Sequence, residues 1–281
     1  MADGALLGGG RPSEEVLGML NQRKTAGENI PWRGPRMFRP SYFAGDDVLE
    51  VAQKAFNVFI SENWLYSRTS FPALGQIEDE VVASLAGLFH GPASAGGIMT
   101  SGGTESLMLA VKIPAHRAEA TARGNRRYNI VLPWSAHPAL DKAADIMHLE
   151  VRRAPPSDDL LADLAWMEGA CDDDTVLLVG SAPPYPYGVM DPLRALSDLA
   201  QRKGIWLHVD ACLGGMILPF AAEAGWPADA FDFSLPGVSS ISVDLHKFGW
   251  ACKGVSALML RDKAEAQHAR TVFTNWPAGL Y

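Results

Sequence analysis

Residues 242–254 read SVDLHKFGWACKG, and this stretch decides the fold and the chemistry that we predict for the chain. It places His246 and Lys247 side by side where a run of strand-forming residues ends. Lysine is among the residues least often fully buried, and this one stands next to the apolar side chains of Leu245 and Phe248. Lys247 therefore either reaches solvent or is covalently bonded to another group.

The composition is typical of a globular protein and argues against nucleic acid as a partner. The 281 residues are 48% hydrophobic and 20% charged, which is enough apolar material for a sizeable core. Lysine and arginine number 24 against 32 aspartate and glutamate residues, so the formal net charge is -8. The sequence contains no basic run of the kind that follows a phosphate backbone.

The cysteines and the apolar pattern favour a cytoplasmic protein without a metal site. Cys171, Cys212 and Cys252 are too few and too scattered for a disulfide framework or a zinc site, which indicates a reducing compartment. The first 15 residues lack the basic segment and apolar run of a secretory signal. No stretch approaches the apolar length of a membrane span, so we expect none.

Alternating strand and helix patterns predict an α/β fold. Short apolar runs that are typical of strands occupy residues 129–133, 175–180, 205–210, 239–244 and 255–260. Helical spacing of apolar residues is found at 13–23, 46–59, 75–89, 104–122, 137–147, 158–169 and 191–203. This alternation predicts a mixed, mostly parallel sheet that is covered on both faces and binds ligands at the carboxyl ends of its strands.

Two regions are expected along the chain. Residues 1–60 are predicted to form an N-terminal arm with helices, in which the Pro- and Arg-rich segment 30–43 is extended. Residues 61–281 are predicted to form one large domain. Within it, Pro114 is expected to end or kink the helix over 104–122, because proline cannot donate the next helical hydrogen bond.

A glycine-containing turn is a candidate phosphate site. Residues 99–112 read MTSGGTESLMLAVK, a turn that leads into an amphipathic helix. Backbone N–H groups at a helix start bind anions, small residues let the ligand approach, and Thr104 adds a hydroxyl. An ordinary helix cap explains the same residues, so the turn alone does not decide between the two interpretations.

Other polar residues follow the predicted strands, each with an ordinary explanation of its own. Asp210 closes the apolar run IWLHVD and is either a turn former or the partner of a buried cation. His137, which precedes Pro138 at a predicted helix start, is either a cap or a catalytic imidazole. Ser181 ends the next strand and is either a turn initiator or a ligand contact.

Pyridoxal 5'-phosphate is a ligand that needs all of these groups together. Its aldehyde condenses with a lysine, its ring nitrogen acts as an electron sink when a carboxylate keeps it protonated, and its phosphate needs fixed donors. Lys247, Asp210 and the turn at Thr104 would supply them. A nicotinamide cofactor fits less well, because the glycines do not form GxGxxG.

Six ordered blocks carry a resemblance to a known family. They are TSGGTES (100–106), HPALDKAA (137–144), GSAPPYPYGVMDP (180–192), HVDACLGGMILPF (208–220), FDFSLPGVSSISVDLHKFGWACKG (231–254) and NWPAGLY (275–281). The chain resembles the sphingosine-1-phosphate lyase branch of the group II pyridoxal-phosphate decarboxylases from about residue 13 to its end. The resemblance implies the large domain of the PLP-dependent transferase fold type I, which is aspartate aminotransferase-like, with residues 61–281 as the PLP-binding domain and the C-terminal small domain missing.

The resemblance also implies a role for particular residues. Lys247 matches the Schiff-base lysine, Asp210 the partner of the pyridine nitrogen, and Lys253 a second lysine that assists proton transfer. The cofactor contacts that it implies are Gly103, Thr104, His137, Ser181 and His246. Side chains that it places near the substrate are Tyr42, Asn63, Tyr185 and Tyr187. Leu65 and Tyr66 depart from the Leu-His of the eukaryotic lyases, which weakens the expectation of an identical substrate.

Three functions remain open after this comparison. The first is retro-aldol cleavage of a phosphorylated amino alcohol, similar to sphingosine 1-phosphate, into an aldehyde and phosphoethanolamine. The second is decarboxylation of an amino acid with the same cofactor. The third is a catalytically impaired fragment, since family members continue beyond the position of Tyr281. The family also implies a small-molecule substrate and a homodimer.

Overall fold

The computed structural model describes residues 10–27, 42–121, 126–226 and 228–275. Contacts divide the chain into two compact units, Met1–Phe43 and Ala44–Tyr281. In the first unit the structure describes the helix α1 (Ser13–Gly27), which confirms the helix predicted from residue 13 and extends it by four residues. Most of the segment predicted to be extended, residues 30–41, lies outside the described residues.

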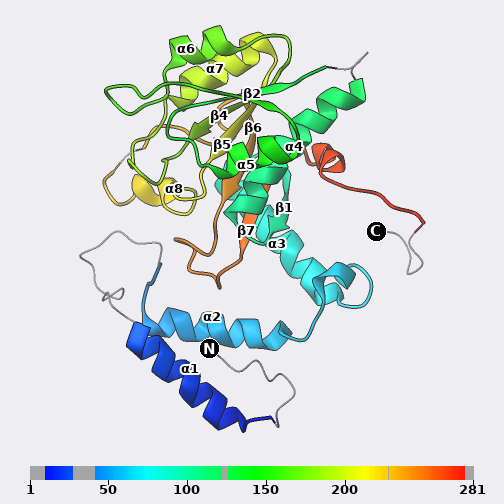
Figure 1. The fold of residues 1–281 in the computed structure, drawn as a ribbon, viewed down its shortest axis with the longest axis vertical. Coiled ribbons are helices and arrows are strands. Elements are labelled where there is room, and N and C mark those ends of the chain that lie inside the picture. The colour runs from blue at the N-terminus through cyan, green and yellow to red at the C-terminus, as the bar shows by residue number, and fades with distance from the viewer. Residues whose placement is uncertain (1–9, 28–41, 122–125, 227, 276–281) are drawn as a thin grey trace, which may run out of the picture. The chain divides into compact units, whose positions relative to one another are not determined.

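The second unit is built on a seven-stranded mixed sheet with the order β1-β7-β6-β5-β4-β2-β3 (Figure 1). Its strands are β1 (Gly96–Thr100), β2 (Asn129–Leu132), β3 (Glu150–Arg153), β4 (Thr175–Ser181), β5 (Trp206–Asp210), β6 (Val238–Val243) and β7 (Ser256–Leu260). The five strands β2 to β6 are parallel to one another, whereas β7 pairs antiparallel with both β6 and β1. The predicted mixed, mostly parallel sheet is therefore confirmed.

Helices connect these strands. They are α2 (Asp46–Phe59), α3 (Pro72–Leu88), α4 (Gly103–Thr121), α5 (Ala139–Ile146), α6 (Leu164–Ala170), α7 (Leu193–Lys203) and α8 (Leu218–Ala221), with 3-10 turns η1 (Trp64–Tyr66) and η2 (Lys263–His268). Helices α6 and α7 cover one face of the sheet, and α4 and α5 cover the other (Figure 1).

Alternating strand residues build two cores, one on each face. Val131, Leu178 and Met259 point into the core that α6 and α7 cover. The neighbouring residues in the same strands, such as Leu132 and Val179, point into the core that α4 and α5 cover. A sheet buried on both faces needs continuous apolar strands, which explains why the runs NIVL and TVLLV were recognisable in the sequence.

Two details differ from the prediction. The helix expected over 158–169 begins only at Leu164, because the Asp159 carboxylate accepts the Leu161 N–H and forms a turn. The helix expected to end or kink at Pro114 continues to Thr121. Pro114 is buried in the core that α4 helps to form, so packing of the helix offsets the hydrogen bond that proline cannot donate.

Candidate functional site

Polar side chains gather at one edge of the sheet, which we call the carboxyl edge. The parallel strands β2, β4, β5 and β6 end there, and β1 ends there too because β7 runs antiparallel to both β1 and β6. The strand β7 begins at the same edge. The turns that follow Thr100, Ser181, Asp210 and Val243 therefore open on a common surface.

Lys247 is held by a buried carboxylate at this edge. Asp244 follows β6 directly and is 3% exposed, and its Oδ2 lies 2.8 Å from the Lys247 Nζ. Its Oδ1 accepts a hydrogen bond of 2.6 Å from the Ser256 hydroxyl. Burial by itself lowers the pKa of Lys247, whereas Cys212, Asp244 and Asp210 raise it, and the net shift is upward. In the structure, an ion pair with Asp244 accommodates the partly buried Lys247 ammonium.

Asp210 stands next to this ion pair at the end of β5. Its Oδ1 accepts hydrogen bonds from the Cys212 backbone N–H at 3.1 Å and from the Ser242 hydroxyl at 3.3 Å. Burial raises the pKa of the Cys212 thiol well above its ordinary value, so the thiol is uncharged at neutral pH. With the thiol uncharged, the raising effect of Cys212 on the pKa of Lys247 falls away, and the carboxylates of Asp244 and Asp210 remain to oppose the effect of burial.

A chain of buried hydrogen bonds supports Asp210 from inside the sheet. The His208 ring is fully buried, with Nδ1 2.9 Å from the Ser240 hydroxyl and Nε2 3.2 Å from the Ser242 hydroxyl. Ser242 in turn donates to Asp210. Burial lowers the pKa of His208 to about 4, so the ring is neutral and fixes the hydroxyls around it without adding charge.

Ser181 presents a buried hydroxyl with no hydrogen-bond partner among the described residues. Its backbone N–H donates to the Asp191 Oδ2 at 2.7 Å, and in the sheet it pairs with Asp210. The Asp191 Oδ1 accepts the Ala162 N–H at 2.9 Å, so both of its oxygens serve as caps for backbone groups. Burial raises the pKa of Asp191 to about 6. Ser135, after β2, has a second buried hydroxyl without a partner in the described part of the chain.

The glycine turn approaches Asp244 closely. Gly103 is the first residue of α4, and a Cβ added there would lie 2.9 Å from both carboxylate oxygens of Asp244. Glu105 accepts hydrogen bonds from the backbone and the hydroxyl of Ser101, which stabilises the turn. Thr104 is exposed in the first turn of the helix, where backbone N–H groups have no partner within the helix.

The two predicted histidines are anchored in different ways. The His246 Nδ1 donates to the Val255 carbonyl at 2.9 Å, and its Nε2 lies 3.9 Å from the Asp244 carboxylate. His137 is exposed, and its Nδ1 accepts the Ala139 N–H at 3.1 Å. The His137 ring thus binds the first backbone N–H of α5, whose N-cap residue is Pro138.

Lys253 lies beside the same cluster. Its Nζ donates to the His246 carbonyl at 3.3 Å. Burial, followed by the charge of Lys247, lowers the pKa of Lys253 below its ordinary value, although Asp244 opposes this. The pKa of Lys247 is therefore raised and the pKa of Lys253 is lowered.

The side chains expected near a substrate belong to segments other than the strand ends that hold Lys247 and Asp210. Asn63 is exposed, and its Oδ1 accepts the Leu65 N–H at 3.0 Å as the cap of η1. Tyr185 and Tyr187 are exposed in the loop after β4. Tyr42 belongs to the first unit, which is described separately from the sheet.

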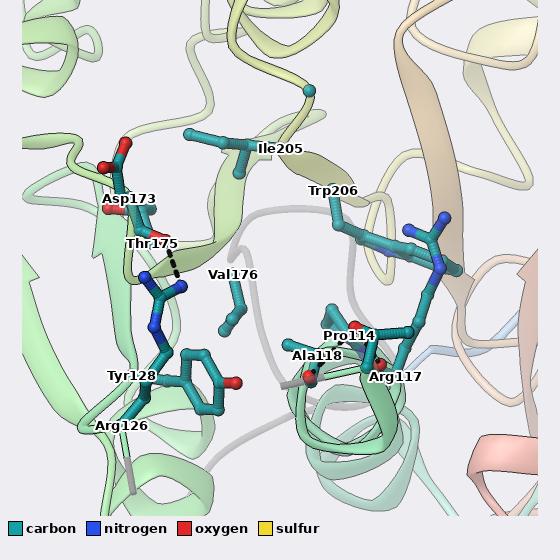
Figure 2. Close-up of a pocket in the computed structure, with 12 residues that line it drawn as sticks. Pro114, Arg117, Ala118, Arg126, Tyr128, Asp173, Thr175, Val176, Ile205 and Trp206 are labelled. Atoms are coloured by element: carbon teal, nitrogen blue, oxygen red, sulfur yellow. Dashed lines mark hydrogen bonds between the residues drawn. The ribbon is translucent and has the colours of Figure 1, made fainter. Parts of the chain in front are cut away.

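A cleft of about 520 Å³ lies elsewhere, at the amino ends of the strands. Thr175 and Trp206, the first residues of β4 and β5, line it together with α4 (Figure 2). Arg117 lies over the Trp206 ring, 5.9 Å from its centroid, and Arg126 donates to the Asp173 carbonyl at 3.4 Å (Figure 2). The cleft is therefore separate from Lys247 and Asp210.

Two features are not found in the part of the chain that the structure describes. No helix there is long and apolar enough to cross a membrane. No group of three or more histidine, cysteine, aspartate or glutamate side chains there is arranged to hold a metal ion.

Comparison with known proteins identifies the class to which this fold and site belong. A model of the pyridoxal-dependent decarboxylase conserved domain matches residues 23–276, so the chain belongs to the pyridoxal-dependent decarboxylase family. Among curated relatives, the sphingosine-1-phosphate lyase of Oryza sativa subsp. japonica is 39% identical over 277 residues, and that of Drosophila melanogaster is 36% identical over 274 residues. These alignments cover 96% and 97% of this chain but 50% of each relative, so the chain spans about half their length.

Solved structures give the same result. The sphingosine-1-phosphate lyase of Burkholderia pseudomallei K96243 superposes with a TM-score of 0.91 at 38% identity, over 98% of this chain and 64% of that one. The glutamate decarboxylase of Lactobacillus brevis superposes with a TM-score of 0.75 at 23% identity, over 98% of this chain and 64% of that one, which shows a shared fold. The fold class and the family predicted from the sequence are confirmed, and pyridoxal 5'-phosphate is the cofactor that the family implies.

The residues at the carboxyl edge fit this cofactor. The unpartnered hydroxyl of Ser181 lies at the end of the strand next to Asp210, where a polar ligand would satisfy it. The start of α4 offers backbone donors to a phosphate. Lys247 supplies the primary amine that an aldehyde requires.

Sequence reasoning missed Asp244 and Asp191. Asp244 ends the predicted strand over 239–244 and precedes Lys247 by three residues, a spacing that brings the two side chains together in a turn. That spacing was a usable signal. Asp191 lies ten residues beyond Ser181 and returns to it through a loop, and no local pattern in the sequence indicates such a contact.

Proposed function

We propose that this chain is the cofactor-binding part of a pyridoxal-phosphate-dependent carbon–carbon lyase. The proposed reaction cleaves a phosphorylated amino alcohol, similar to sphingosine 1-phosphate, into an aldehyde and phosphoethanolamine. The observation that carries the proposal is the cluster of Lys247, Asp210 and the unpartnered Ser181 hydroxyl at one edge of the sheet. The sphingosine-1-phosphate lyases that match nearly the whole chain at 36% to 39% identity supply the substrate class.

Each residue has a proposed role that its surroundings support. Bound pyridoxal 5'-phosphate supplies an aldehyde for amine exchange and a ring that accepts the electrons of the broken bond. Lys247 would hold the cofactor through its side-chain amine. Asp210, supported by Ser242 and Cys212, carries the negative charge that keeps the ring nitrogen protonated.

The phosphate and the ring are assigned to residues around this pair. Gly103 and Thr104 at the start of α4 are proposed to bind the phosphate, together with His246. Ser181 is proposed to donate to the cofactor, and His137 is proposed to stack on the ring with its exposed imidazole.

Lys253 is the proposed carrier of a proton during cleavage. Its lowered pKa brings the amine closer to the range in which a base operates at neutral pH. Tyr42, Asn63 and Tyr185 are proposed to contact the substrate, as the family resemblance implies. The Asn63 Nδ2 can donate to a substrate phosphate while its Oδ1 still accepts the Leu65 N–H.

A second candidate is decarboxylation of an amino acid at the same site. The matching family model is a decarboxylase domain, and a probable L-tyrosine/L-aspartate decarboxylase of Methanoculleus marisnigri is 37% identical over 254 residues. The two reactions differ in the bond that is broken. Two incubations distinguish the reactions, one with a phosphorylated long-chain amino alcohol and one with tyrosine, aspartate and glutamate. Carbon–carbon cleavage of the amino alcohol releases an aldehyde, whereas decarboxylation of an amino acid releases carbon dioxide.

The state of the chain also belongs to the proposal. We propose a homodimer, a cytoplasmic location consistent with three unpaired cysteines, and the division into an arm over 1–60 and a cofactor domain over 61–281. Because the chain spans about half of its curated relatives, cofactor binding without turnover is the third candidate. In that case the protein retains bound cofactor but releases neither aldehyde nor carbon dioxide.

A further inference from the structure

Asp244 has no role in the function proposed above, yet it occupies the centre of the cluster. Its two oxygens contact three different side chains, namely Ser256 at 2.6 Å, Lys247 at 2.8 Å and His246 at 3.9 Å. It is 3% exposed, so these contacts are shielded from solvent. A buried carboxylate with these partners fixes both the position and the charge of the lysine beside it.

We propose that Asp244 is a positioning residue that keeps Lys247 as an ammonium ion and so sets the pH above which Lys247 reacts with an aldehyde. The inference rests on the proposed function, because it assumes that Lys247 is the amine that binds the cofactor. Only the free amine adds to a carbonyl carbon, so the ammonium must first release a proton to solvent. The ion pair with Asp244 opposes that release.

The other charged groups around Lys247 do not replace Asp244. Asp210 also attracts the ammonium, but the structure shows no hydrogen bond between their described side chains. Lys253 repels it, the Cys212 thiol is uncharged, and the His246 Nδ1 is engaged by the Val255 carbonyl. Asp244 is thus the charged neighbour at hydrogen-bond distance, and its removal should have the largest effect.

Lys253 provides an internal reference within the same chain. It is the more exposed of the two lysines and shares the same cluster, where its Nζ donates to the His246 carbonyl. Lys247 is more buried, and burial alone would make it the more easily deprotonated amine. The inference therefore predicts an order opposite to the one expected from burial.

The test is acetylation of the protein without added cofactor by limiting acetic anhydride from pH 7 to pH 11, with each lysine peptide quantified by mass spectrometry. In this step the amine forms a bond to the acetyl carbon, and acetate and a proton leave. In the unmodified protein, Lys253 should become reactive at a lower pH than Lys247. The reverse order would overturn the inference, and this measurement needs no variant.

Asp244→Asn removes the charge and keeps the shape and an acceptor for Ser256. An opposite charge this close shifts a pKa by about 1 to 3 units, so acetylation of Lys247 at pH 8 should rise at least about tenfold. The matched control is Asp232→Asn, which alters another buried aspartate, 2.7 Å from the Nδ1 of His90, and should leave the Lys247 profile unchanged. The inference would be overturned if acetylation of Lys247 in Asp244→Asn changed by less than about twofold, or if Asp232→Asn changed it equally.

The outcomes separate this inference from the proposed function. Cofactor loading of the unmodified protein is measured in parallel by borohydride reduction and peptide mapping. Loading on Lys247 together with an unchanged acetylation profile in Asp244→Asn removes the role of Asp244 and leaves the proposed function intact. Loading on a different lysine contradicts the proposed function and this inference together.

Discussion

Gly103→Ala is the substitution for which the structure gives the sharpest expectation. Gly103 begins α4, and the added methyl carbon would lie 2.9 Å from both Oδ1 and Oδ2 of Asp244. Those oxygens cannot move freely, because Ser256 and Lys247 hold them at 2.6 and 2.8 Å. Either the helix start or the ion pair must therefore shift.

Two opposing effects determine how much Gly103→Ala changes the free energy of unfolding. Alanine is favoured over glycine in a helix by roughly 0.5 to 1 kcal/mol. Forcing an extra carbon into a packed site costs about 1 to 3 kcal/mol. The overlap here involves a buried carboxylate, so we expect Gly103→Ala to lower the free energy of unfolding by about 1 to 2 kcal/mol.

Gly87→Ala is the matched control. Gly87 also lies in a helix, α3, but an added Cβ there has no atom within 4 Å. Only the helix preference acts, so this variant should be as stable as the original protein or more stable by up to about 1 kcal/mol. The two glycines should therefore respond with opposite signs in urea unfolding followed by circular dichroism.

A double-mutant cycle isolates the contact. In an Asp244→Ala background the carboxylate is gone, so the cost of Gly103→Ala should largely disappear. A cost that persists in that background would show that the close approach to Asp244 is not its cause. Equal stability of Gly103→Ala and Gly87→Ala would refute the packing argument itself.

Three further predictions follow from other buried groups. The Arg261 guanidinium donates to the carbonyls of Phe233, Leu235 and Val238, and a lysine cannot reach all three. Arg261→Lys should therefore lower the free energy of unfolding, measured in urea, by about 1 to 3 kcal/mol. A loss below about 0.5 kcal/mol would contradict this expectation. The His208 ring should titrate near pH 4 when followed by NMR. Because its pKa in the folded state lies below the unfolded value of 6.5, its contribution to stability should be lost as the pH falls from 6.5 to 4. A titration midpoint above pH 6 would disprove its burial as a neutral ring. The Asp191 carboxyl should titrate near pH 6. Because its pKa in the folded state lies above the unfolded value of 3.8, its contribution to stability should be lost as the pH rises from 3.8 to 6. A midpoint near pH 4 in the NMR titration of its carboxyl carbon would rule this out.

The parts of the fold that were predictable are those where packing leaves a strong pattern. β4 and β5 are buried on both faces, so their apolar runs stand out against the polar helices between them. β1 was missed because GGIMT begins with two glycines, and Gly97 is required by the close approach of Met259 rather than by any strand preference. β3 was missed because EVRR is half-buried at the sheet margin and carries three charged residues.

The site was predictable to the extent that its residues end strands. Asp210 and Ser181 come together because adjacent parallel strands end in register, which the strand assignment already implied. The contact between Asp244 and Lys247 depends on the path of a turn, and the contact between Asp191 and Ser181 depends on the path of the loop over residues 182–190. The spacing of three residues was a usable signal for the first contact, whereas no local pattern indicated the second, so Asp191 could be identified only from the structure.

The most direct test of the account is purification with added pyridoxal 5'-phosphate, in parallel with Lys247→Ala. The account predicts a visible absorption band that co-elutes with the unmodified protein and is absent from the variant. It also predicts that borohydride reduction places the mass of the cofactor on the peptide that contains Lys247. An identical band on both proteins, a label on another lysine, or no bound cofactor on either protein would contradict the account.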